Sequence, residues 1–297
     1  ASVVALVLDA DPQSELYRSG AIQRISVVNG ALEDFWTLER AINGHEIETV
    51  FHLGAQTIVE TADRSPLPTF EANIRGTYNL LEVCRLHQKL VRRIVVASSD
   101  KAYGAQRRLP YTEDMSLAGR HPYEVSKSCV DLITQAYHET YGLAVGIARC
   151  GNIFGGGDLK WSRIVPGTIR SILQGERPII RSDGKFVRDY IYVTAVVRAY
   201  MHLAESLDDE RVQGKAFNFS CESPKTVLEI VAAIRKLMRR DDLEPEIKNG
   251  AKGEIRDQYL SAQKARDVLG WRPEYDLKTG LQETIEWYRE LFAGNGK

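Results

Sequence analysis

Short apolar runs rich in β-branched residues alternate with amphipathic stretches along the first half of the chain. The runs are Val3–Leu8, Ile25–Val28, Thr49–Leu53, Ile94–Ser98 and Leu143–Arg149. Apolar residues at helical spacing lie between them, in Asp11–Arg18, Asp34–Ile42, Pro68–His87 and Pro122–Thr140. Strands that alternate with helices of this length predict an α/β fold, in which helices cover both faces of a doubly wound parallel sheet.

After Arg149 this alternation stops. The stretch Gly155-Gly156-Gly157-Asp158 predicts a loop. Helices are then expected at Ile164–Gln174, Thr226–Met238, Ala262–Leu269 and Leu281–Phe292, and short strands at Pro178–Arg181 and Ala216–Phe219. We therefore expect residues 1–150 to form one domain and residues 151–297 a smaller α/β domain, with about residues 185–207 returning to the first.

The composition is typical of a soluble globular protein, with 43% hydrophobic and 27% charged residues among 297. The net charge of -1 gives no reason to expect nucleic acid or an anionic membrane as a partner. No apolar run is long enough to span a bilayer, and no signal peptide precedes the first run. The cysteines at 84, 129, 150 and 221 lack metal-ligand spacing, so we expect reduced thiols, no bound metal and a cytoplasmic protein.

Two polar patches suggest a reaction. Ser98-Ser99-Asp100-Lys101 ends an apolar run, and ligands of open α/β sheets bind beyond the carboxyl ends of the strands. Tyr123 and Lys127 are four residues apart in a helical stretch, so both side chains project from one face. An ammonium beside a phenol favours the phenolate, which is a base for a sugar or alcohol hydroxyl. Taken alone, Tyr-x-x-x-Lys more often belongs to an ordinary surface helix.

Eight segments of the chain form a wider pattern. They are Phe51–Gln56, Asn73–Glu82, Ser98–Gly104, Pro122–Lys127, Arg149–Gly155, Arg163–Pro166, Val187–Val193 and Leu269–Pro273. In this order they resemble the extended short-chain dehydrogenase/reductase family, which comprises nucleotide-sugar epimerases and dehydratases, over nearly the whole chain. The resemblance implies a Rossmann-like domain that binds NAD, followed by a substrate domain.

The resemblance also implies roles for individual residues. Tyr123 would take the proton of the sugar 4-hydroxyl as NAD oxidises C4. Lys127 would hold the nicotinamide ribose and lower the pKa of Tyr123, while Ser99 would hydrogen bond the same oxygen. Asp9 matches the acid that binds the adenosine ribose. The implied cofactor contacts are Asp9, Ala31, Leu32, Leu53, Gly54, Ala55, Asn73, Ala97, Ser98, Tyr123, Lys127 and Cys150.

The beginning of the chain departs from the family pattern. A dinucleotide-binding fold opens with a strand, a glycine-rich turn and a helix whose N-terminus holds the pyrophosphate. No Gly-x-Gly-x-x-Gly precedes Val3–Leu8, which resembles the second strand of the family. We therefore expect the first strand and the glycine-rich turn to be absent from this chain, and the NAD-binding domain to be incomplete at its N-terminus. Ala31 stands where the family usually has an Asp near the adenine.

The substrate implied by the resemblance is a nucleotide-diphosphate sugar. Gln56, Asn152, Arg163 and Arg188 match substrate-binding positions, and Arg256 is a further candidate. Arginine suits this role because its planar guanidinium pairs with phosphate oxygens through two hydrogen bonds. The resemblance also implies a homodimer that pairs the helices near residues 68–87 and 122–140, although the apolar residues there could equally face the sheet.

The two residues after Ser99 bear on the type of reaction. A 4-epimerase needs only reversible oxidation at C4, whereas a 4,6-dehydratase also needs an acid for the 6-hydroxyl and a base for the C5 proton. Asp100 and Lys101 resemble the Ser-Asp-Lys pattern of CDP-glucose 4,6-dehydratases, with Asp100 as a buried acid and Lys101 as the base. We expect a dehydratase with a CDP-glucose-like substrate. The alternatives are an NAD-dependent 4-epimerase and an inactive protein that only binds a nucleotide sugar.

Overall fold

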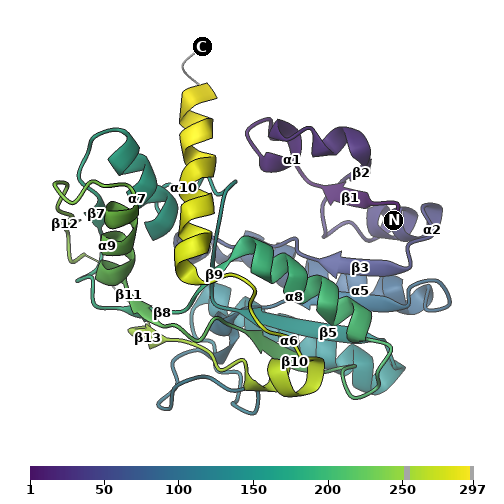
Figure 1. Ribbon diagram of the computed structural model, residues 1–297. Helices are drawn as coiled ribbons and strands as arrows, with labels where there is room; N and C mark the ends of the chain where they lie inside the picture. Colours follow the sequence, from purple (N-terminus) through teal and green to yellow (C-terminus); the bar gives the residue numbers. More distant parts are fainter. Residues whose placement is uncertain (251–254, 295–297) are drawn as a thin grey trace.

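The largest sheet of the protein has four parallel strands. The computed structural model describes residues 1–250 and 255–294, and orders these strands β10-β5-β4-β3 (Figure 1). Their bounds are β3 Thr49–His52, β4 Arg93–Ala97, β5 Val145–Cys150 and β10 Ala216–Phe219. A separate parallel pair is formed by β1 (Val4–Val7) and β2 (Ser26–Asn29). The predicted strands and the predicted parallel α/β fold are confirmed.

Helices cover both faces of the four-stranded sheet, and the side chains of β4 show why. Ile94 and Val96 pack in one apolar cluster with residues of the helices α2, α5 and α6, whereas Val95 packs in another with residues of α8. Successive side chains of a strand point to opposite faces, so β4 is buried on both sides. The four helices are α2 Phe35–Gly44, α5 Gly76–Leu86, α6 Pro122–Tyr141 and α8 Val193–Ser206.

Three predicted helices differ from expectation. The helix predicted at Ala262–Leu269 is mainly the π-helical turn η4 at Ala265–Leu269. The stretch Pro68–His87 is divided into α4 (Pro66–Phe70), a π-helical turn at Glu71–Arg75 and α5. The helix predicted at Asp11–Arg18 is only α1 (Glu15–Arg18). By contrast, α6 matches its prediction, because Pro122 stands in its first turn and Gly142 ends it with a φ of 70°.

The second half of the chain builds a smaller layer of helices and short strands. The helices α7 (Ile164–Leu173), α9 (Val227–Leu237) and α10 (Leu277–Gly294) share one apolar cluster. The strand β8 (Val187–Arg188) lies between β11 (Lys225–Thr226) and β13 (Asp257–Gln258). Two further parallel pairs are β6 (Asn152–Phe154) with β9 (Tyr190–Tyr192) and β7 (Ile179–Ile180) with β12 (Glu246–Ile247). The remaining elements are α3 Val59–Arg64, η1 Ala21–Arg24, η2 Glu71–Arg75, η3 Asp100–Tyr103 and η4 Ala265–Leu269.

The expected division at residue 150 remains a prediction, but some later elements lie with the first half. As expected, α8 within residues 185–207 packs on β4 and β5. Beyond that segment, β10 also joins the sheet as the neighbour of β5, and η4 packs beside β10 and α8. Within the described residues, no helix is long and apolar enough to cross a membrane.

Candidate active site

The carboxyl end of β4 turns directly into a short polar segment. Ser99 has extended backbone angles and caps the 3-10 helix η3, since its Oγ accepts a hydrogen bond from the Lys101 N–H at 3.2 Å. The same hydroxyl lies 3.0 Å from Oδ1 of Asp100, to which it donates. The polar segment predicted beyond this strand is therefore folded back on itself at the strand tip.

The helix α6 places Tyr123 and Lys127 against this strand tip. Both residues are buried, with 9% and 5% of their surface exposed. Lys127 Nζ donates to the Ala97 carbonyl at 2.8 Å, and the Ser99 side chain lies close enough to the Tyr123 phenol to lower its pKa. The structure thus brings together the three residues of the predicted catalytic trio.

The pKa of Tyr123 is shifted in the direction opposite to the one expected. Burial raises the pKa of Tyr123 to about 12, and the Asp100 carboxylate adds to the rise. Burial lowers the pKa of Lys127 to about 8. The expectation that Lys127 lowers the pKa of Tyr123 is wrong for this structure, because desolvation dominates and the Lys127 amine is bonded to Ala97 instead.

Asp100 has the surroundings expected of a carboxylic acid that keeps its proton. It is only 3% exposed, and burial raises its pKa, although Lys101, Ser99 and Arg188 act in the other direction. Lys101 is half-buried, and its Nζ donates to Oε1 of Gln258. An acid therefore lies near the phenol of Tyr123, and an amine lies near that acid.

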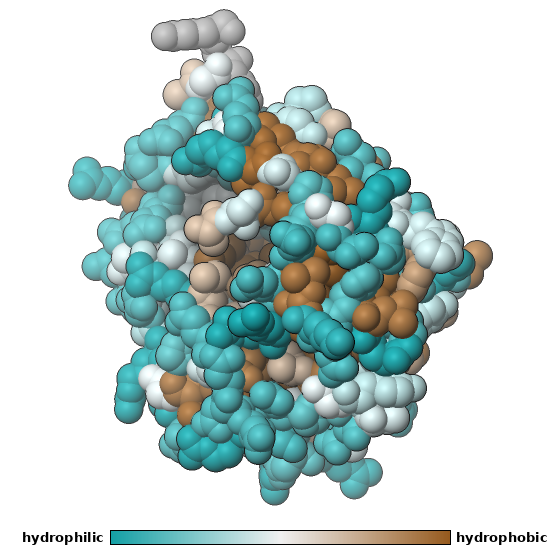
Figure 2. All heavy atoms as spheres, turned by 90° about the vertical axis from the view of Figure 1, so that its right-hand side faces the viewer, coloured by the Kyte–Doolittle hydropathy of each residue, from teal (hydrophilic) through white to brown (hydrophobic). Residues whose placement is uncertain are grey.

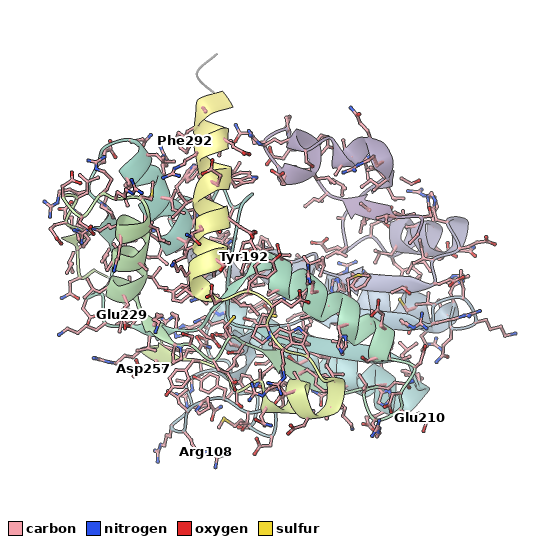
Figure 3. The ribbon with its side chains drawn as sticks, viewed as in Figure 1. Arg108, Tyr192, Glu210, Glu229, Asp257 and Phe292 are labelled. Atoms are coloured by element: carbon pink, nitrogen blue, oxygen red, sulfur yellow. The ribbon has the colours of Figure 1, made fainter. Side chains whose placement is uncertain are left out.

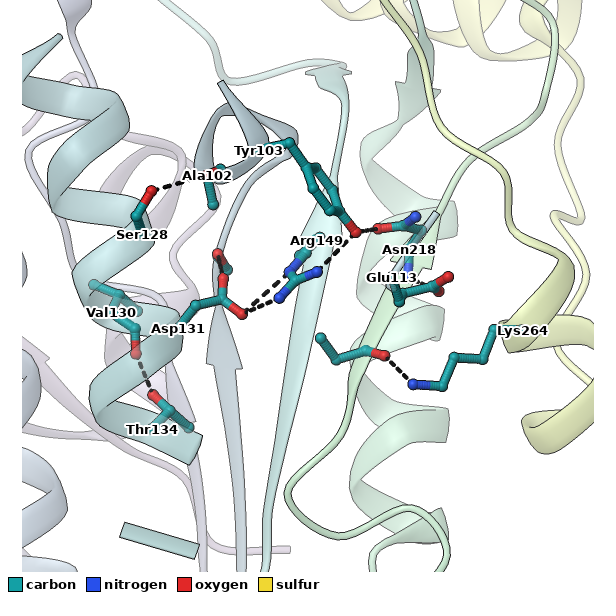
Figure 4. A network of polar contacts seen from close by, with 12 residues as sticks. Ala102, Tyr103, Glu113, Ser128, Val130, Asp131, Thr134, Arg149, Asn218 and Lys264 are labelled. Carbon is teal, nitrogen blue, oxygen red and sulfur yellow. Dashed lines mark hydrogen bonds and ion pairs between the residues drawn. The ribbon is translucent and has the colours of Figure 1, made fainter. Parts of the chain in front are cut away.

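A buried ion pair between α6 and β5 contacts the segment at the end of β4 (Figure 4). Arg149 of β5 donates to Asp131 Oδ1 of α6 at 2.6 and 3.1 Å, and these side chains are 3% and 0% exposed. The second oxygen of Asp131 accepts a hydrogen bond from Ser98. Arg149 also donates to the Tyr103 hydroxyl at 2.8 Å, which in turn donates to Asn218 of β10 at 2.7 Å. The network ties α6, β5 and β10 to the segment that carries Ser99.

A second set of hydrogen bonds lies near Lys127, between the end of β3 and α6. His52, at the end of β3, is hydrogen bonded to Thr77 at 2.8 Å, and burial followed by the Lys127 charge lowers the pKa of His52 to about 3. Asn73 accepts from the Gln56 N–H at 2.7 Å and donates to the Ser126 hydroxyl at 2.9 Å. The side chain of Asn73 thus joins the loop after β3 to α6, while its predicted cofactor contact stays a prediction.

The other predicted cofactor residues lie along the carboxyl edges of the two sheets. Asp9 is exposed just after β1, and Leu53 is 56% exposed just after β3. Gly54 packs closely on Leu32, since a Cβ there would lie 2.8 Å from Cδ1 of Leu32, whose side chain would have to shift. Figure 2 shows the side of the molecule that carries β1, β2 and α2, with apolar atoms between polar ones and a hollow near its centre. The remaining members of the set are Ala31 and Ala55, which are half-exposed, Ala97 and Ser98 at the end of β4, and the buried Cys150 at the end of β5.

Exposed apolar atoms and small residues at strand ends are suitable for a flat ring, so the residues near Leu53 and Ser98 fit the nicotinamide end of the predicted cofactor. The exposed Asp9 carboxylate is suited to ribose hydroxyls.

The predicted substrate residues lie around Asp100 and in the second half of the chain. Arg188 of β8 is buried, and its positive charge lowers the pKa of Asp100. Its guanidinium donates to the Arg256 carbonyl at 2.8 Å. Arg163 is close enough to lower the pKa of Tyr123, and pairs with Asp158 at 2.9 Å. The remaining members are Asn152 in β6, the exposed Arg256, and Gln56, whose side-chain amide bonds Ile58 and Thr69.

Sequence reasoning missed two features of the site. Gln258 is 0% exposed and contacts both Asp100 and Lys101, yet it lies 157 residues or more along the chain from them. Asp131 is one helical turn after Lys127, and that spacing was the only signal in the sequence. Among the residues that the structure describes, no group of three His, Cys, Asp or Glu side chains could hold a metal ion.

Comparison with known sequences finds similarity to nucleotide-sugar dehydratases. Residues 8–284 match the family model described as GDP-mannose 4,6 dehydratase. The dTDP-glucose 4,6-dehydratase of Xanthomonas campestris is 30% identical over 278 residues, which are 88% of this chain and 78% of that protein. The CDP-glucose 4,6-dehydratase of Salmonella typhimurium is 29% identical over 280 residues, which are 89% of this chain and 77% of that protein.

Comparison with solved structures finds both dehydratases and epimerases. A dTDP-glucose 4,6-dehydratase from Streptomyces venezuelae, crystallised with NAD, superposes with a TM-score of 0.87 at 26% identity, covering 99% of this chain and 89% of that one. A UDP-glucose 4-epimerase from Thermotoga maritima, crystallised with UDP-glucose, superposes with a TM-score of 0.88 at 28% identity, covering 98% and 92%.

Proposed function

Since the chain belongs to the GDP-mannose 4,6 dehydratase family of extended short-chain dehydrogenase/reductases, we propose that it is an NAD-dependent nucleotide-sugar 4,6-dehydratase that acts on CDP-glucose. The observation that carries the choice of dehydration is the buried Asp100, placed beside Lys101 and electrostatically coupled to Tyr123. Related dehydratases are 29% and 30% identical to this chain.

Tyr123 and Ser99 handle the first proton transfer. Tyr123 accepts the proton of the sugar 4-hydroxyl, and the Ser99 hydroxyl hydrogen bonds the same oxygen. NAD, when bound, would supply the hydride acceptor for C4 and the hydride donor for C6, so that the sugar leaves without net oxidation. Lys127, whose amine donates to the Ala97 carbonyl, would bind the nicotinamide ribose. Asp9, Leu32, Leu53, Gly54 and Ala55 line the remainder of the cofactor site.

Asp100 and Lys101 carry out the elimination. The ketone at C4 makes the C5 proton acidic, and the neutral Lys101 amine removes it. Asp100 gives its proton to the departing 6-hydroxyl, so that one water leaves and a C5–C6 double bond forms. Lys101 then returns a proton to C5. Solvent protonates Asp100 again and takes up the proton held by Tyr123, so that all three residues regain their starting state.

Arginines around this pair provide binding for the diphosphate of the substrate. The charge of Arg163 lowers the pKa of Tyr123, and the charge of Arg188 lowers that of Asp100, so both arginines lie near the proposed reaction centre. Arg256 is exposed beside Arg188, whose guanidinium holds the Arg256 carbonyl. Choice of CDP rather than dTDP rests on the resemblance of Asp100-Lys101 to the CDP-glucose enzymes.

Isotope incorporation tests the reaction. The purified protein is incubated with CDP-glucose in deuterated water, with dTDP-glucose, GDP-mannose and UDP-glucose in parallel, and products are identified by NMR and mass spectrometry. A 4-keto-6-deoxy product with deuterium at C5 is expected from CDP-glucose. An unlabelled C4 epimer would refute the proposal, and a labelled product from dTDP-glucose alone would retain dehydration and refute the CDP assignment.

Epimerisation is the second candidate, favoured by the TM-score of 0.88 with the Thermotoga maritima epimerase. It would use Tyr123 and Ser99 in the same way and leave Asp100 and Lys101 without a role. A nucleotide-sugar-binding protein without activity is the third candidate. It predicts that no substrate of the panel reacts and that the protein still binds one of them in a calorimeter.

A further inference from the structure

The side chain of Gln258 joins Asp100 and Lys101 from the opposite half of the molecule. Gln258 is completely buried. Its Nε2 donates to the Asp100 carbonyl at 2.9 Å, and its Oε1 accepts a hydrogen bond from Lys101 Nζ. Only the amide NH2 can donate to a carbonyl, so the bond to Asp100 fixes the amide orientation and leaves the oxygen facing Lys101.

A small sheet holds Gln258 in this place. Its strand β13 runs parallel to β8, with Gln258 opposite Arg188, and β8 is paired on its other edge with β11. Asp257, labelled in Figure 3, marks where β13 lies below the helices of the second half. The position of the amide is therefore set by the backbone of the second half of the chain, not by η3, on which Asp100 and Lys101 lie.

We propose that Gln258 is a positioning residue that holds the Lys101 amine for removal of the C5 proton. This inference rests on the proposed dehydratase function. Lysine has a flexible four-carbon stem, and one fixed acceptor restricts the directions in which its nitrogen can point. The amide carbonyl carries no net charge, so it holds the amine without the strong preference for an ammonium that a carboxylate would impose. The bond to the Asp100 carbonyl keeps the acid next to the base.

The test separates elimination from oxidation at C4. Gln258→Met keeps the length of the side chain and removes both hydrogen bonds. Formation of reduced bound NAD, followed by absorbance in a single turnover, should stay near the wild-type rate. Exchange of the C5 proton and release of product should fall about a hundredfold in kcat with KM unchanged, as expected for a misplaced reacting group. Gln213→Met is the matched control, because Gln213 bonds only the Leu207 carbonyl, far from Asp100 in the sequence.

A second measurement distinguishes positioning from general destabilisation. In a Lys101→Met background, Gln258→Met should cause no further loss of elimination, because the residue acts through Lys101. A further loss of similar size, or equal loss of oxidation and elimination in the single variant, would overturn the inference. If Gln258→Met does not fold, Gln258→Glu is measured in its place. It keeps an acceptor but adds charge, and elimination should again fall while oxidation continues.

The dehydratase function and the role of Gln258 can fail independently, because the function is tested on the wild-type protein and the role of Gln258 on the variants. A wild-type protein that forms a C4 epimer, or that never reduces bound NAD, refutes the dehydratase. A wild-type dehydratase whose elimination does not depend on Gln258 refutes only the positioning role.

Discussion

The buried pair Asp131–Arg149 allows a quantitative prediction of stability. Asp131→Leu and Arg149→Met each remove one charge and leave the other without its partner in a dry environment, where the two side chains are now 0% and 3% exposed. The variants retain most of the original volume, so packing changes little. Asp131→Leu also removes the acceptor of Ser98, and Arg149→Met removes a donor to Tyr103.

The expected losses follow from the two hydrogen bonds at 2.6 and 3.1 Å and the lack of solvent around them. Breaking a buried pair by removing one partner destabilises a protein by about 3 to 5 kcal/mol, because an uncompensated charge stays buried. The double variant has no such charge, so it should lose far less than the sum of the single losses. We expect a coupling energy of about 3 kcal/mol or more.

Urea denaturation measures these values. The free energy of unfolding is obtained by linear extrapolation for the wild type, both single variants and the double variant, with far-UV circular dichroism and tryptophan fluorescence as independent probes. Losses that simply add, or single losses below about 1 kcal/mol, would refute the reasoning, since such values are typical of solvent-exposed pairs. Arg211→Met, which removes an exposed pair with Asp209, is the matched control and should change stability little.

Three further outcomes follow from the structure. Folding lowers the pKa of His52 from 6.5 to about 3, so the unfolded state binds a proton first as the pH falls, and stability is lost between pH 6.5 and 3. In His52→Gln, the free energy of unfolding measured in urea should fall by about 2 kcal/mol less between pH 6.5 and pH 5 than it does in the wild type. Lys101→Met should lower dehydration at least about a hundredfold while reduced bound NAD still forms, which stopped-flow absorbance would detect; unchanged dehydration would exclude Lys101 as the base. Leu132 is 57% exposed on α6, so Leu132→Glu should leave the fold intact and convert the expected homodimer to a monomer. Light scattering measures the mass in solution, and a monomeric wild type would contradict the dimer.

The elements that carry Ser99, Tyr123 and Lys127 were predictable because their signals are local. An apolar run ends at Ser98, and α6 is bounded by Pro122 and Gly142, whose effects on the backbone do not depend on the rest of the fold. Helical spacing then places Tyr123 and Lys127 on one face. Their arrangement against the strand tip follows from parallel topology, in which the carboxyl ends of strands share one edge.

The features that could not be predicted depend on contacts distant in the sequence. Gln258 contacts Lys101 although the two residues are 157 positions apart in the sequence, and no local pattern in β13 marks Gln258 as part of the site. The π-helical turn at Glu71–Arg75 arises where Asn73 bridges the loop after β3 and Ser126 of α6, and where Gly76 approaches Leu32 so closely that a Cβ would lie 2.6 Å away. The pKa of Tyr123 is raised because the phenol is buried, and the sequence alone does not show that burial.

The raised pKa of Tyr123 has a specific origin that ties the base to the acid. After burial, the largest contribution to the rise is the negative charge of Asp100, whose own pKa is also raised by burial. A protonated Asp100 carries no charge, so the protonation that prepares Asp100 to act as an acid also makes the phenol of Tyr123 easier to ionise. One proton on Asp100 therefore favours both the oxidation at C4 and the elimination that follows.

The variant Asp100→Asn tests this coupling. It removes the charge but keeps the size, and it blocks elimination, so reduced bound NAD accumulates and reports the oxidation step alone. At pH values above the pKa of Asp100, where the wild type holds a carboxylate, the variant has no such charge. The pH at which its oxidation rate rises should therefore lie lower than in the wild type, by on the order of one unit. Asp114→Asn, an exposed carboxylate on the loop before α6, is the control and should leave the profile in place. A profile that does not move in Asp100→Asn, or that moves to higher pH, would show that the Asp100 charge does not govern the phenol of Tyr123.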